Sequence, residues 1–290
     1  MRADTANPVN LPQRLRRLSD QGWLELLAAS ISSRTVAGIT LPAFPSVDVQ
    51  VQFTGSANIQ TLQEAFGFYS LVKDYSSRLS NPIGPTSRLL DFGVGWGRFL
   101  RFFMKDINAD SLYGCDIDPV VLEICRQMGV PGNLDRTYAG GKLPYPDAHF
   151  DVIFSYSVFT HLPEPAHQHW LAELARVARP GCVFTLTLEP RSFIDFVSQL
   201  GGRSNLEQAW HRHLATYAHM CAQLYQDFDE GRIAYIPTGG GGEYRDNTIY
   251  GDAIVPLAYI EREWSRYFDV RDYIDDRNRF SQAVLIVQRQ

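Results

Sequence analysis

The chain has 290 residues, a formal net charge of −5 and an isoelectric point near 5.8. Extensive binding to nucleic acid needs clustered Lys and Arg that displace counterions, so this charge balance argues against a nucleic-acid-binding role. Hydrophobic residues make up 45% and charged residues 20%, which is ordinary for a folded globular protein with a sizeable core.

The sequence also lacks the marks of membrane insertion and of a disulfide framework. No apolar stretch approaches the roughly 18 residues that a membrane helix needs, and no charged-then-apolar segment opens the chain. The four cysteines, Cys115, Cys125, Cys182 and Cys221, are scattered without a C-x-x-C pair. We expect buried free thiols and therefore a cytoplasmic protein that binds no membrane.

Residues 1–80 are predicted to form a helical N-terminal cap. Residues 11–30 favour one or two short helices broken near Gly22. The alternation over Val49–Ser56 predicts a short strand or an extended strap, and Ile59–Leu79 predicts a helix with Ser56 or Asn58 as its cap.

The most informative segment runs from Leu89 to Arg98. It joins an apolar run to Asp91 and then to three alternate glycines, Gly93, Gly95 and Gly97. Glycine admits backbone conformations that a side chain forbids, so amide groups can come close to a ligand, and a following helix aims its unpaired N–H groups at the same place. The pattern predicts a strand that turns sharply into a helix around a nucleoside cofactor.

Two classes of cofactor use such a turn. Dinucleotide-binding turns read G-x-G-x-x-G, whereas this one reads D-x-G-x-G-x-G, with its third glycine one step earlier. A second strand over 111–115 runs into Asp116, whose carboxylate is placed to accept hydrogen bonds from both hydroxyls of a ribose. The spacing therefore departs from the dinucleotide pattern and argues against NAD.

Further segments extend the pattern as far as the fifth strand. Residues 143–155 lead into a fourth strand, 157–164 lead into a helix, and Arg179-Pro180-Gly181 precede a fifth strand. In this order, over about 87–190, the chain resembles the class I methyltransferases that depend on S-adenosylmethionine (SAM). It is most similar to a bacterial subgroup with F-G-x-G-W-G-R, G-C-D-I-D-P and S-V-F-T-H-L, often found near glycan or natural-product biosynthesis.

The alternation of elements predicts an α/β fold, a Rossmann-like doubly wound sheet that is mostly parallel. The expected strands lie near 87–92, 111–116, 134–138, 150–156 and 181–188, and the expected helices lie near 97–105, 119–128, 163–178 and 191–200. Residues 203–230 look helical and the four glycines at 239–242 suggest a lid, with a plain solvent loop as the alternative.

The chain is expected to end with a helix over 257–267 and two strands, 268–274 and 283–287, paired antiparallel at the sheet edge. The predicted parts are therefore the cap (1–80), a SAM-binding core (81–190), a helical insertion with a glycine-rich lid (191–256), and a C-terminal helix and strands that complete the sheet (257–290).

The resemblance implies a site for SAM, and for its product S-adenosylhomocysteine, at the carboxyl ends of the strands. The expected cofactor-binding residues are Asp91, Phe92, Gly93, Gly95, Gly97, Asp116, Ile117, Leu143 and Ser155. Many relatives carry an acid before the Leu-Pro pair to bind adenine, but this chain has Tyr138-Ala139-Gly140-Gly141-Lys142 there. No metal site is expected, because the His pairs 167/169 and 211/213 each stand two apart on a helix and face different directions.

His161 is the candidate general base, with Tyr156 as a further candidate in the wall of the site. His161 follows the fourth strand, and an imidazole with a pKa near 6.5 can remove a proton near neutral pH. The alternatives are that His161 caps the helix at Pro163 or packs under the methionine end of the cofactor.

Five more side chains are candidates for the site or its surroundings. Arg98 and Arg101 are predicted to lie on a solvated helix face, although Arg98 could reach an anionic group. Glu189 either touches substrate or caps the next helix. Tyr244 and Tyr250 are candidates for stacking on a sugar or a ring.

Together these features predict a SAM-dependent methyltransferase of a small molecule, acting at an oxygen of a natural product or sugar. The alternatives are an N- or C-methyltransferase of the same fold, a catalytically silent SAM-binding protein, and a nicotinamide oxidoreductase. The sequence leaves open whether the protein forms a homodimer.

Overall fold

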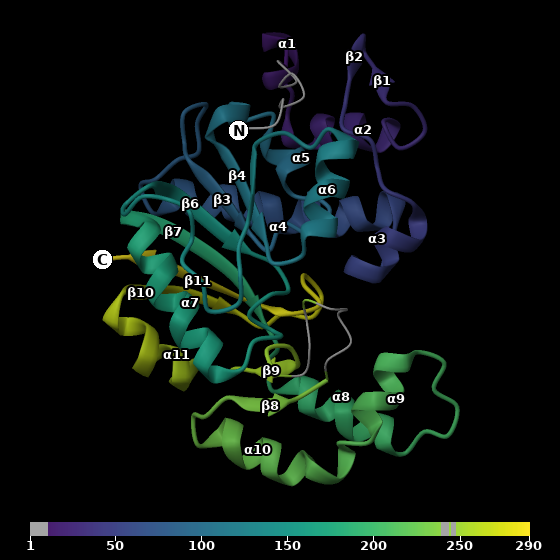
Figure 1. The fold of residues 1–290 in the computed structure, drawn as a ribbon, viewed down its shortest axis with the longest axis vertical. Helices are drawn as coiled ribbons and strands as arrows, with labels where there is room; N and C mark the ends of the chain where they lie inside the picture. Colours follow the sequence, from purple (N-terminus) through teal and green to yellow (C-terminus); the bar gives the residue numbers. More distant parts are fainter. Residues whose placement is uncertain (1–10, 239–243, 245–247) are drawn as a thin grey trace. The chain divides into compact units, whose positions relative to one another are not determined.

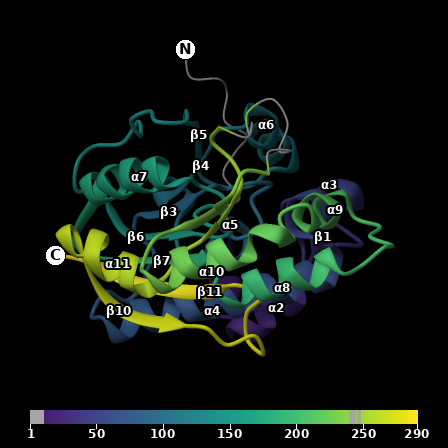
Figure 2. The ribbon, with the colours of Figure 1, turned by 90° about the horizontal axis from the view of Figure 1, so that it is seen from below.

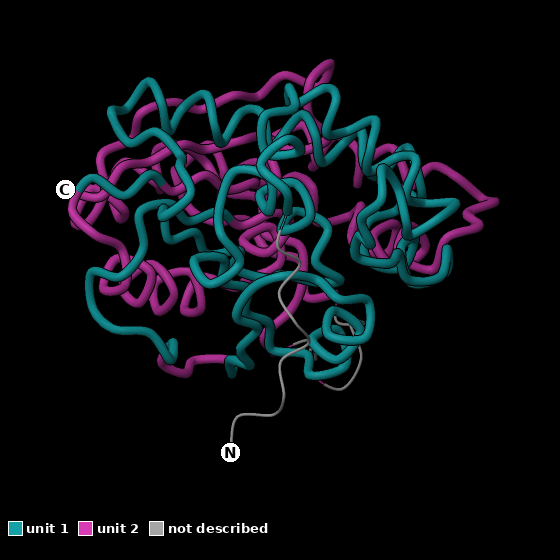
Figure 3. The backbone as a smooth tube through the Cα atoms, turned by 90° about the horizontal axis from the view of Figure 1, so that it is seen from above, with its two compact units in different colours: residues 1–138, 143–154, 181–183 teal, residues 139–142, 155–180, 184–290 magenta. Residues whose placement is uncertain are grey.

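The computed structural model describes residues 11–238, residue 244 and residues 248–290, and divides the chain into two compact units. Unit 1 comprises residues 1–138, 143–154 and 181–183, and unit 2 comprises 139–142, 155–180 and 184–290 (Figure 3). The chain therefore passes between the units several times.

Unit 1 contains the parallel strands that carry the glycine-rich turn. β3 (Leu89–Phe92) is flanked by β4 (Leu112–Asp116) and β6 (Phe150–Ser155), and β4 pairs in turn with β5 (Asn133–Arg136). All four residues of β3 are buried, as a strand covered on both faces requires. The expected strands near 87–92, 111–116, 134–138 and 150–156 are confirmed, with shifts of a few residues at their ends.

Helices and a small hairpin precede and interleave these strands. They are α1 (Gln13–Arg16), α2 (Asp20–Ala29), β1 (Thr35–Val36), β2 (Ile39–Thr40), α3 (Val47–Thr54), α4 (Asn58–Arg78), α5 (Leu100–Phe103), η1 (Ala109–Ser111) and α6 (Pro119–Met128) (Figure 1). The N-terminal helices were expected, but the break lies between α1 and α2, and Gly22 lies inside α2.

The strand or strap expected over Val49–Ser56 is wrong, because those residues lie in or next to helix α3. The Ser46 side chain accepts a hydrogen bond from Val49 N, and Gly55 ends the helix in the left-handed region with φ 72°. These two end signals decide the conformation over the Val-Gln-Val-Gln alternation. Neither Ser56 nor Asn58 caps α4 with its side chain; Gln50 Oε1 accepts from Asn58 N instead, at 2.9 Å.

Unit 2 holds most of β7 and the rest of the chain. Its elements are α7 (Glu164–Val177), β7 (Ala178–Leu188), α8 (Ser192–Gly201), α9 (Ala209–Ala215), η2 (Ala218–Met220), α10 (Cys221–Asp229), β8 (Ala234–Ile236), β9 (Asp252–Ile254), α11 (Leu257–Glu263), η3 (Trp264–Arg266), β10 (Phe268–Ile274) and β11 (Ala283–Arg289). β10 and β11 pair antiparallel, as expected, with Val270 opposite Val287.

The segment after β7 forms a small helical group with its own core. α8, α9 and α10 lie together in Figures 1 and 2, and the core that they share with β8 includes the buried side chains of Ile194, Val197, Leu214 and Leu224. Residues 203–230, which were expected to look helical, contain α9, η2 and α10 with breaks between them. Trp210 and Met220 in this segment are both exposed by more than a third.

The hairpin β8–β9 was not expected at all. These strands flank the four glycines, and Tyr235 pairs with Ala253 across them. The expected lid at 239–242 lies outside the described residues.

The seven strands of the main sheet follow the order β10-β11-β7-β6-β3-β4-β5. The predicted α/β Rossmann-like fold is therefore confirmed, including the antiparallel C-terminal edge. All four cysteines are free and buried, as expected. None of the helices in the described part of the chain combines the length and the apolar character needed to span a bilayer.

Candidate functional site

The turn after β3 has the geometry that its three glycines predict. Gly93, Gly95 and Gly97 all have positive φ, at 88°, 49° and 77°. Gly93 N and Val94 N both donate to Cys115 O, which fastens the turn to the end of β4. A Cβ on Gly95 would meet nothing within 4 Å, whereas a Cβ on Gly97 would lie 2.6 Å from a methyl group of Val130. The turn thus packs on one side and leaves space beside Gly95.

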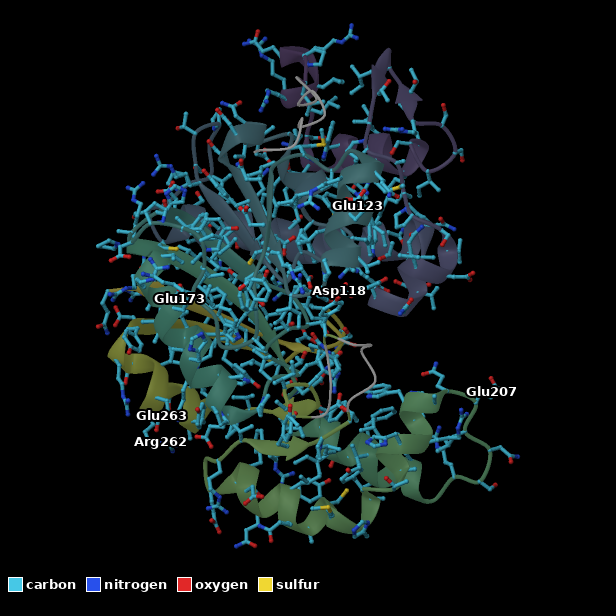
Figure 4. The ribbon with its side chains drawn as sticks, in the orientation of Figure 1. Asp118, Glu123, Glu173, Glu207, Arg262 and Glu263 are labelled. Carbon is cyan, nitrogen blue, oxygen red and sulfur yellow. The ribbon has the colours of Figure 1, made fainter. Side chains whose placement is uncertain are left out.

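Asp116 is locked in place at the end of β4 by two backbone amides. Its Oδ2 accepts from Gly95 N and its Oδ1 from Asp118 N, each at 3.0 Å. Each carboxylate oxygen has a further lone pair, so the group can still accept from a diol. Asp118 caps α6 by accepting from Val120 N, and Figure 4 labels it with Glu123 on that helix.

Asp91 lies buried beside Asp116 in unit 1. Burial raises the pKa of Asp91 well above its usual range, the charge of Asp116 raises it further, and Arg98 partly opposes both. Its Oδ2 has no hydrogen-bond partner within the described structure. A positive charge nearby favours the ionised form of a carboxyl, so a cation at this end of the sheet would counter the rise in the pKa of Asp91.

Arg98 and Arg101 correct the expectation of a solvated face, because both are buried. Arg98 donates to Thr61 Oγ1 at 3.1 Å and lies 3.7 Å from a carboxylate oxygen of Glu64, so α4 holds it. Arg101 donates to Pro42 O at 2.9 Å and packs over the Trp96 ring. These contacts explain the burial of both side chains, which helical periodicity alone could not reveal.

The other expected cofactor residues fall into both units. In unit 1, Phe92 and Leu143 are buried and Ile117 is partly exposed. Ser155 is fully buried at the end of β6 and Tyr156 follows it partly exposed, both in unit 2. The structure therefore brings Asp91, the three glycines and Asp116 together, and the roles of all these residues stay predictions.

His161 belongs to unit 2 and is held by the segment that leads into β9. Its Nδ1 lies 2.8 Å from Gly251 O and 3.8 Å from Asp252 Oδ1, and its Nε2 lies 3.5 Å from Ser157 Oγ. Tyr250 stacks on the imidazole with ring centroids 4.5 Å apart. His161 does not cap α7, whose N-terminus at Pro163 has no side-chain cap, so that alternative is wrong.

Glu189 lies directly after β7 in the same unit and is buried, with 8% of its surface exposed. Burial raises the pKa of Glu189 from 4.5 to about 7, although the hydrogen bond from Gln282 and the charge of Arg277 lower it. Gln282 Nε2 donates both to Glu189 Oε1 at 2.9 Å and to Ser157 Oγ at 3.1 Å. Glu189 does not cap α8, which begins without a side-chain cap, so that alternative is wrong. The carboxylate of Glu189 is instead paired with the side-chain amide of Gln282.

The side chains that contact His161 and Glu189 include three that the sequence did not point to, namely Ser157, Asp252 and Gln282. Asp252 stands 91 positions after His161, and no spacing rule links the two. One signal was present: Asp252 is the acid that opens the apolar run Ala253-Ile254-Val255, which marks it as a charge placed at a buried strand.

Tyr250 was expected to stack on a ligand, and in the structure it stacks on His161. Within the described residues, no group of three or more His, Cys, Asp or Glu is placed to hold a metal ion.

Comparison with known proteins identifies the part of the chain that contains the glycine-rich turn. A family model described as "Methyltransferase domain" matches residues 89–181. The chain is 32% identical over 121 residues to sarcosine/dimethylglycine N-methyltransferase of Halorhodospira halochloris, covering 38% of this chain and 40% of that one. It is 32% identical over 105 residues to 27-O-demethylrifamycin SV methyltransferase of Amycolatopsis mediterranei, covering 34% and 38%.

The matched region is thus less than half of these curated relatives. A solved SAM-dependent methyltransferase from Mesorhizobium loti superposes with a TM-score of 0.50 at 13% identity, covering 76% of this chain and all of that one. At that identity the likeness concerns the fold alone.

Proposed function

Because residues 89–181 are a class I SAM-dependent methyltransferase domain, we propose that this protein transfers the methyl group of SAM to an oxygen of a small molecule, a natural product or a sugar. When bound, SAM supplies an electrophilic methyl group on a positively charged sulfur. The protein then has to bind the nucleoside, orient the acceptor, exclude water and take up a proton.

One observation carries the choice of cofactor: two carboxyl groups meet at the glycine-rich turn, and one oxygen of Asp91 is buried without a hydrogen-bond partner among the described residues. Asp116 would accept from the ribose hydroxyls while the backbone of Gly93 and Gly95 passes close to the methionine end. The paired acids favour a cationic ligand and oppose the anionic pyrophosphate of a dinucleotide. The space beside Gly95 is compatible with a ligand at that point.

The other expected residues complete the cofactor site. Phe92, Ile117 and Leu143 would contact the adenosine, and Ser155 would bound the site at the end of β6. Without an acid in the segment 138–142, the adenine would be held by packing and backbone groups.

The proposal of an oxygen acceptor rests on His161. A hydroxyl is a weak nucleophile until its proton is removed, whereas a neutral amine attacks without a base. His161 Nδ1 faces the Gly251 carbonyl, so Nε2 is the nitrogen that can take the proton. Tyr156, which follows the same strand, would help to position the acceptor.

Ligand binding followed by an acceptor screen tests the proposal. We expect SAM and S-adenosylhomocysteine to raise the melting temperature and NAD to leave it unchanged, since ligands that bind the native state stabilise it. Incubation with methyl-labelled SAM and matched pairs of acceptors, a hydroxyl compound and its amine analogue, should label the hydroxyl compound.

Stabilisation by NAD alone would contradict the cofactor. Labelling of nitrogen or carbon acceptors only would contradict the oxygen assignment, and SAM binding without transfer to any acceptor would indicate a silent SAM-binding protein.

A further inference from the structure

The loop that carries His161 is clamped to the strand β9 by backbone hydrogen bonds. Gly251 N donates to His161 O at 2.8 Å, and Ala253 N donates to Thr160 O at 2.7 Å. All of these residues belong to unit 2. Two segments 90 residues apart are thereby held in register, so the side chain of Asp252, which lies between the two donors, has a fixed place beside the imidazole.

The Gly251 carbonyl fixes the tautomer of His161. A carbonyl oxygen can only accept, so the Nδ1 atom that lies 2.8 Å from it carries the proton. In the neutral imidazole the other nitrogen, Nε2, is then the basic one. Nε2 lies 3.5 Å from Ser157 Oγ, and Ser157 itself adopts a positive φ of 57°, a conformation that costs a non-glycine residue free energy.

Asp252 is oriented by groups other than His161. Its Oδ2 accepts from Thr238 Oγ1 at 2.9 Å and from Trp210 Nε1 at 3.3 Å, which leaves Oδ1 on the side of the imidazole, 3.8 Å from Nδ1. That distance is too long for a hydrogen bond and short enough for attraction between opposite charges. The carboxylate of Asp252 therefore stabilises a positive charge on the imidazole ring, while the carbonyl of Gly251 keeps the proton of the neutral ring on Nδ1.

Further titratable groups surround the pair. Burial raises the pKa of Asp252, and the nearby His161 and His213 lower it. Glu189 lies close enough for its charge to interact with that of Asp252. The charge of Asp252 also raises the pKa of the Tyr235 hydroxyl. Tyr250 stacks on the face of the imidazole ring. Asp252 itself lies at ion-pair distance from His161, with 3.8 Å between Oδ1 and Nδ1.

We propose that Asp252 is a positioning residue for His161: together with the Gly251 carbonyl it holds the imidazole with Nε2 basic, and its charge stabilises the imidazolium that forms when Nε2 takes a proton. The inference rests on the proposed function. In the proton step the O–H bond of the acceptor breaks, the proton moves to Nε2, and the imidazolium later releases it to water.

Nuclear magnetic resonance of the imidazole nitrogens tests the pairing without any turnover. In the wild-type protein we expect the neutral His161 ring to be protonated at Nδ1. In Asp252→Asn we expect the pKa of His161 to fall by about one to two pH units, because loss of a negative charge at about 4 Å disfavours the imidazolium. The control Asp229→Asn removes an exposed acid that pairs with Arg191, and should leave that pKa unchanged.

An Nε2-protonated neutral ring in the wild type, or the same pKa of His161 in wild type and Asp252→Asn, overturns the inference. If Asp252→Asn does not fold, the carboxyl carbon resonance of Asp252 in the wild type decides instead. Interacting sites titrate together, so it should show an inflection at the pKa of His161, and its absence overturns the pairing.

A kinetic readout separates the inference from the proposed function. With an acceptor found by the screen, Asp252→Asn should lower kcat at least tenfold, move the acid limb of the pH profile of kcat to lower pH, and leave KM for SAM unchanged. Failure of the wild-type protein to transfer methyl groups overturns the proposed function, while the resonance of His161 still decides the pairing.

Discussion

The two units place their polar groups in different ways. In unit 1 the candidate cofactor site is built between Asp91 and Asp118, mostly from backbone amides and from glycines whose φ is positive. In unit 2 the cluster around His161 is built from side chains as far apart as Ser157 and Gln282, which stand 125 residues from each other. One region is local and backbone-built, and the other is assembled across a long stretch of chain.

This difference has a chemical meaning. A fixed backbone suits the recognition of one unchanging cofactor, whereas side chains on separate elements can be exchanged one at a time to suit different acceptors. The match to the family model ends at residue 181, before Glu189, Asp252 and Gln282. If the comparison is right, substitutions in unit 1 change the binding of the cofactor, and substitutions in unit 2 change turnover.

The largest expected effect is on turnover in unit 2. His161→Ala should lower kcat by about 10²- to 10⁴-fold, the usual contribution of a general base, and leave the affinity for S-adenosylhomocysteine nearly unchanged. Steady-state kinetics and calorimetry measure the two quantities. His219→Ala, which alters an exposed histidine of the same unit, is the control. An unaltered kcat in His161→Ala would remove this residue as the base.

The converse effect is expected in unit 1. Asp116→Ala should weaken the binding of S-adenosylhomocysteine about 100-fold, because hydrogen bonds from a ribose to a charged acceptor contribute about 1.5–3 kcal/mol each. Calorimetry measures the affinity, and Asp110→Ala supplies a control at an exposed acid just before β4. Equal affinities in the wild type and Asp116→Ala would show that the nucleoside binds elsewhere.

The same contrast explains how much the sequence could predict. The turn after β3 was predictable because Asp91 and its three glycines stand within seven residues and each has a local conformational reason. The Asp252 and His161 pair was not, because a contact across 91 positions depends on how the hairpin β8–β9 closes. The strand or strap predicted over Val49–Ser56 was wrong for a third reason. The helix-end signals of α3, at Ser46 and Gly55, outweigh the alternation of apolar and polar residues between them.

An effect of comparable size, on stability rather than on function, is expected from the buried Glu189, whose pKa is raised to about 7 by burial. Between pH 4.5 and 7 the folded state keeps the proton that the unfolded state has lost, so stability falls as the pH rises through this window. The total change is on the order of 3 kcal/mol. Glu189→Gln removes it, because the amide does not titrate and its oxygen can still accept from Gln282.

Chemical denaturation of both proteins at pH 4 and at pH 7.5 measures this contribution. We expect the free energy of unfolding of the variant to increase relative to that of the wild type as the pH rises. A difference between the two proteins that does not change with pH would mean that Glu189 has the same pKa in the folded and unfolded states, so that Gln282 and Arg277 offset its burial.

The smallest expected difference lies between two glycines of the turn, and it separates packing from ligand contact within unit 1. Alanine at either position costs about 1 kcal/mol for a left-handed backbone. At Gly97 the new methyl group would also lie 2.6 and 2.8 Å from the methyl groups of Val130, which costs about 1–3 kcal/mol more, whereas at Gly95 it enters open space.

Gly97→Ala should therefore be less stable than Gly95→Ala by about 2 kcal/mol in denaturant unfolding. Gly95→Ala should in turn lose affinity for S-adenosylhomocysteine if the cofactor uses that space. A Gly95→Ala protein that is stable and binds the ligand as tightly as the wild type would show that the backbone at this turn shapes the fold without touching the cofactor. The contrast between a backbone-built and a side-chain-built region would then no longer describe where binding and turnover reside.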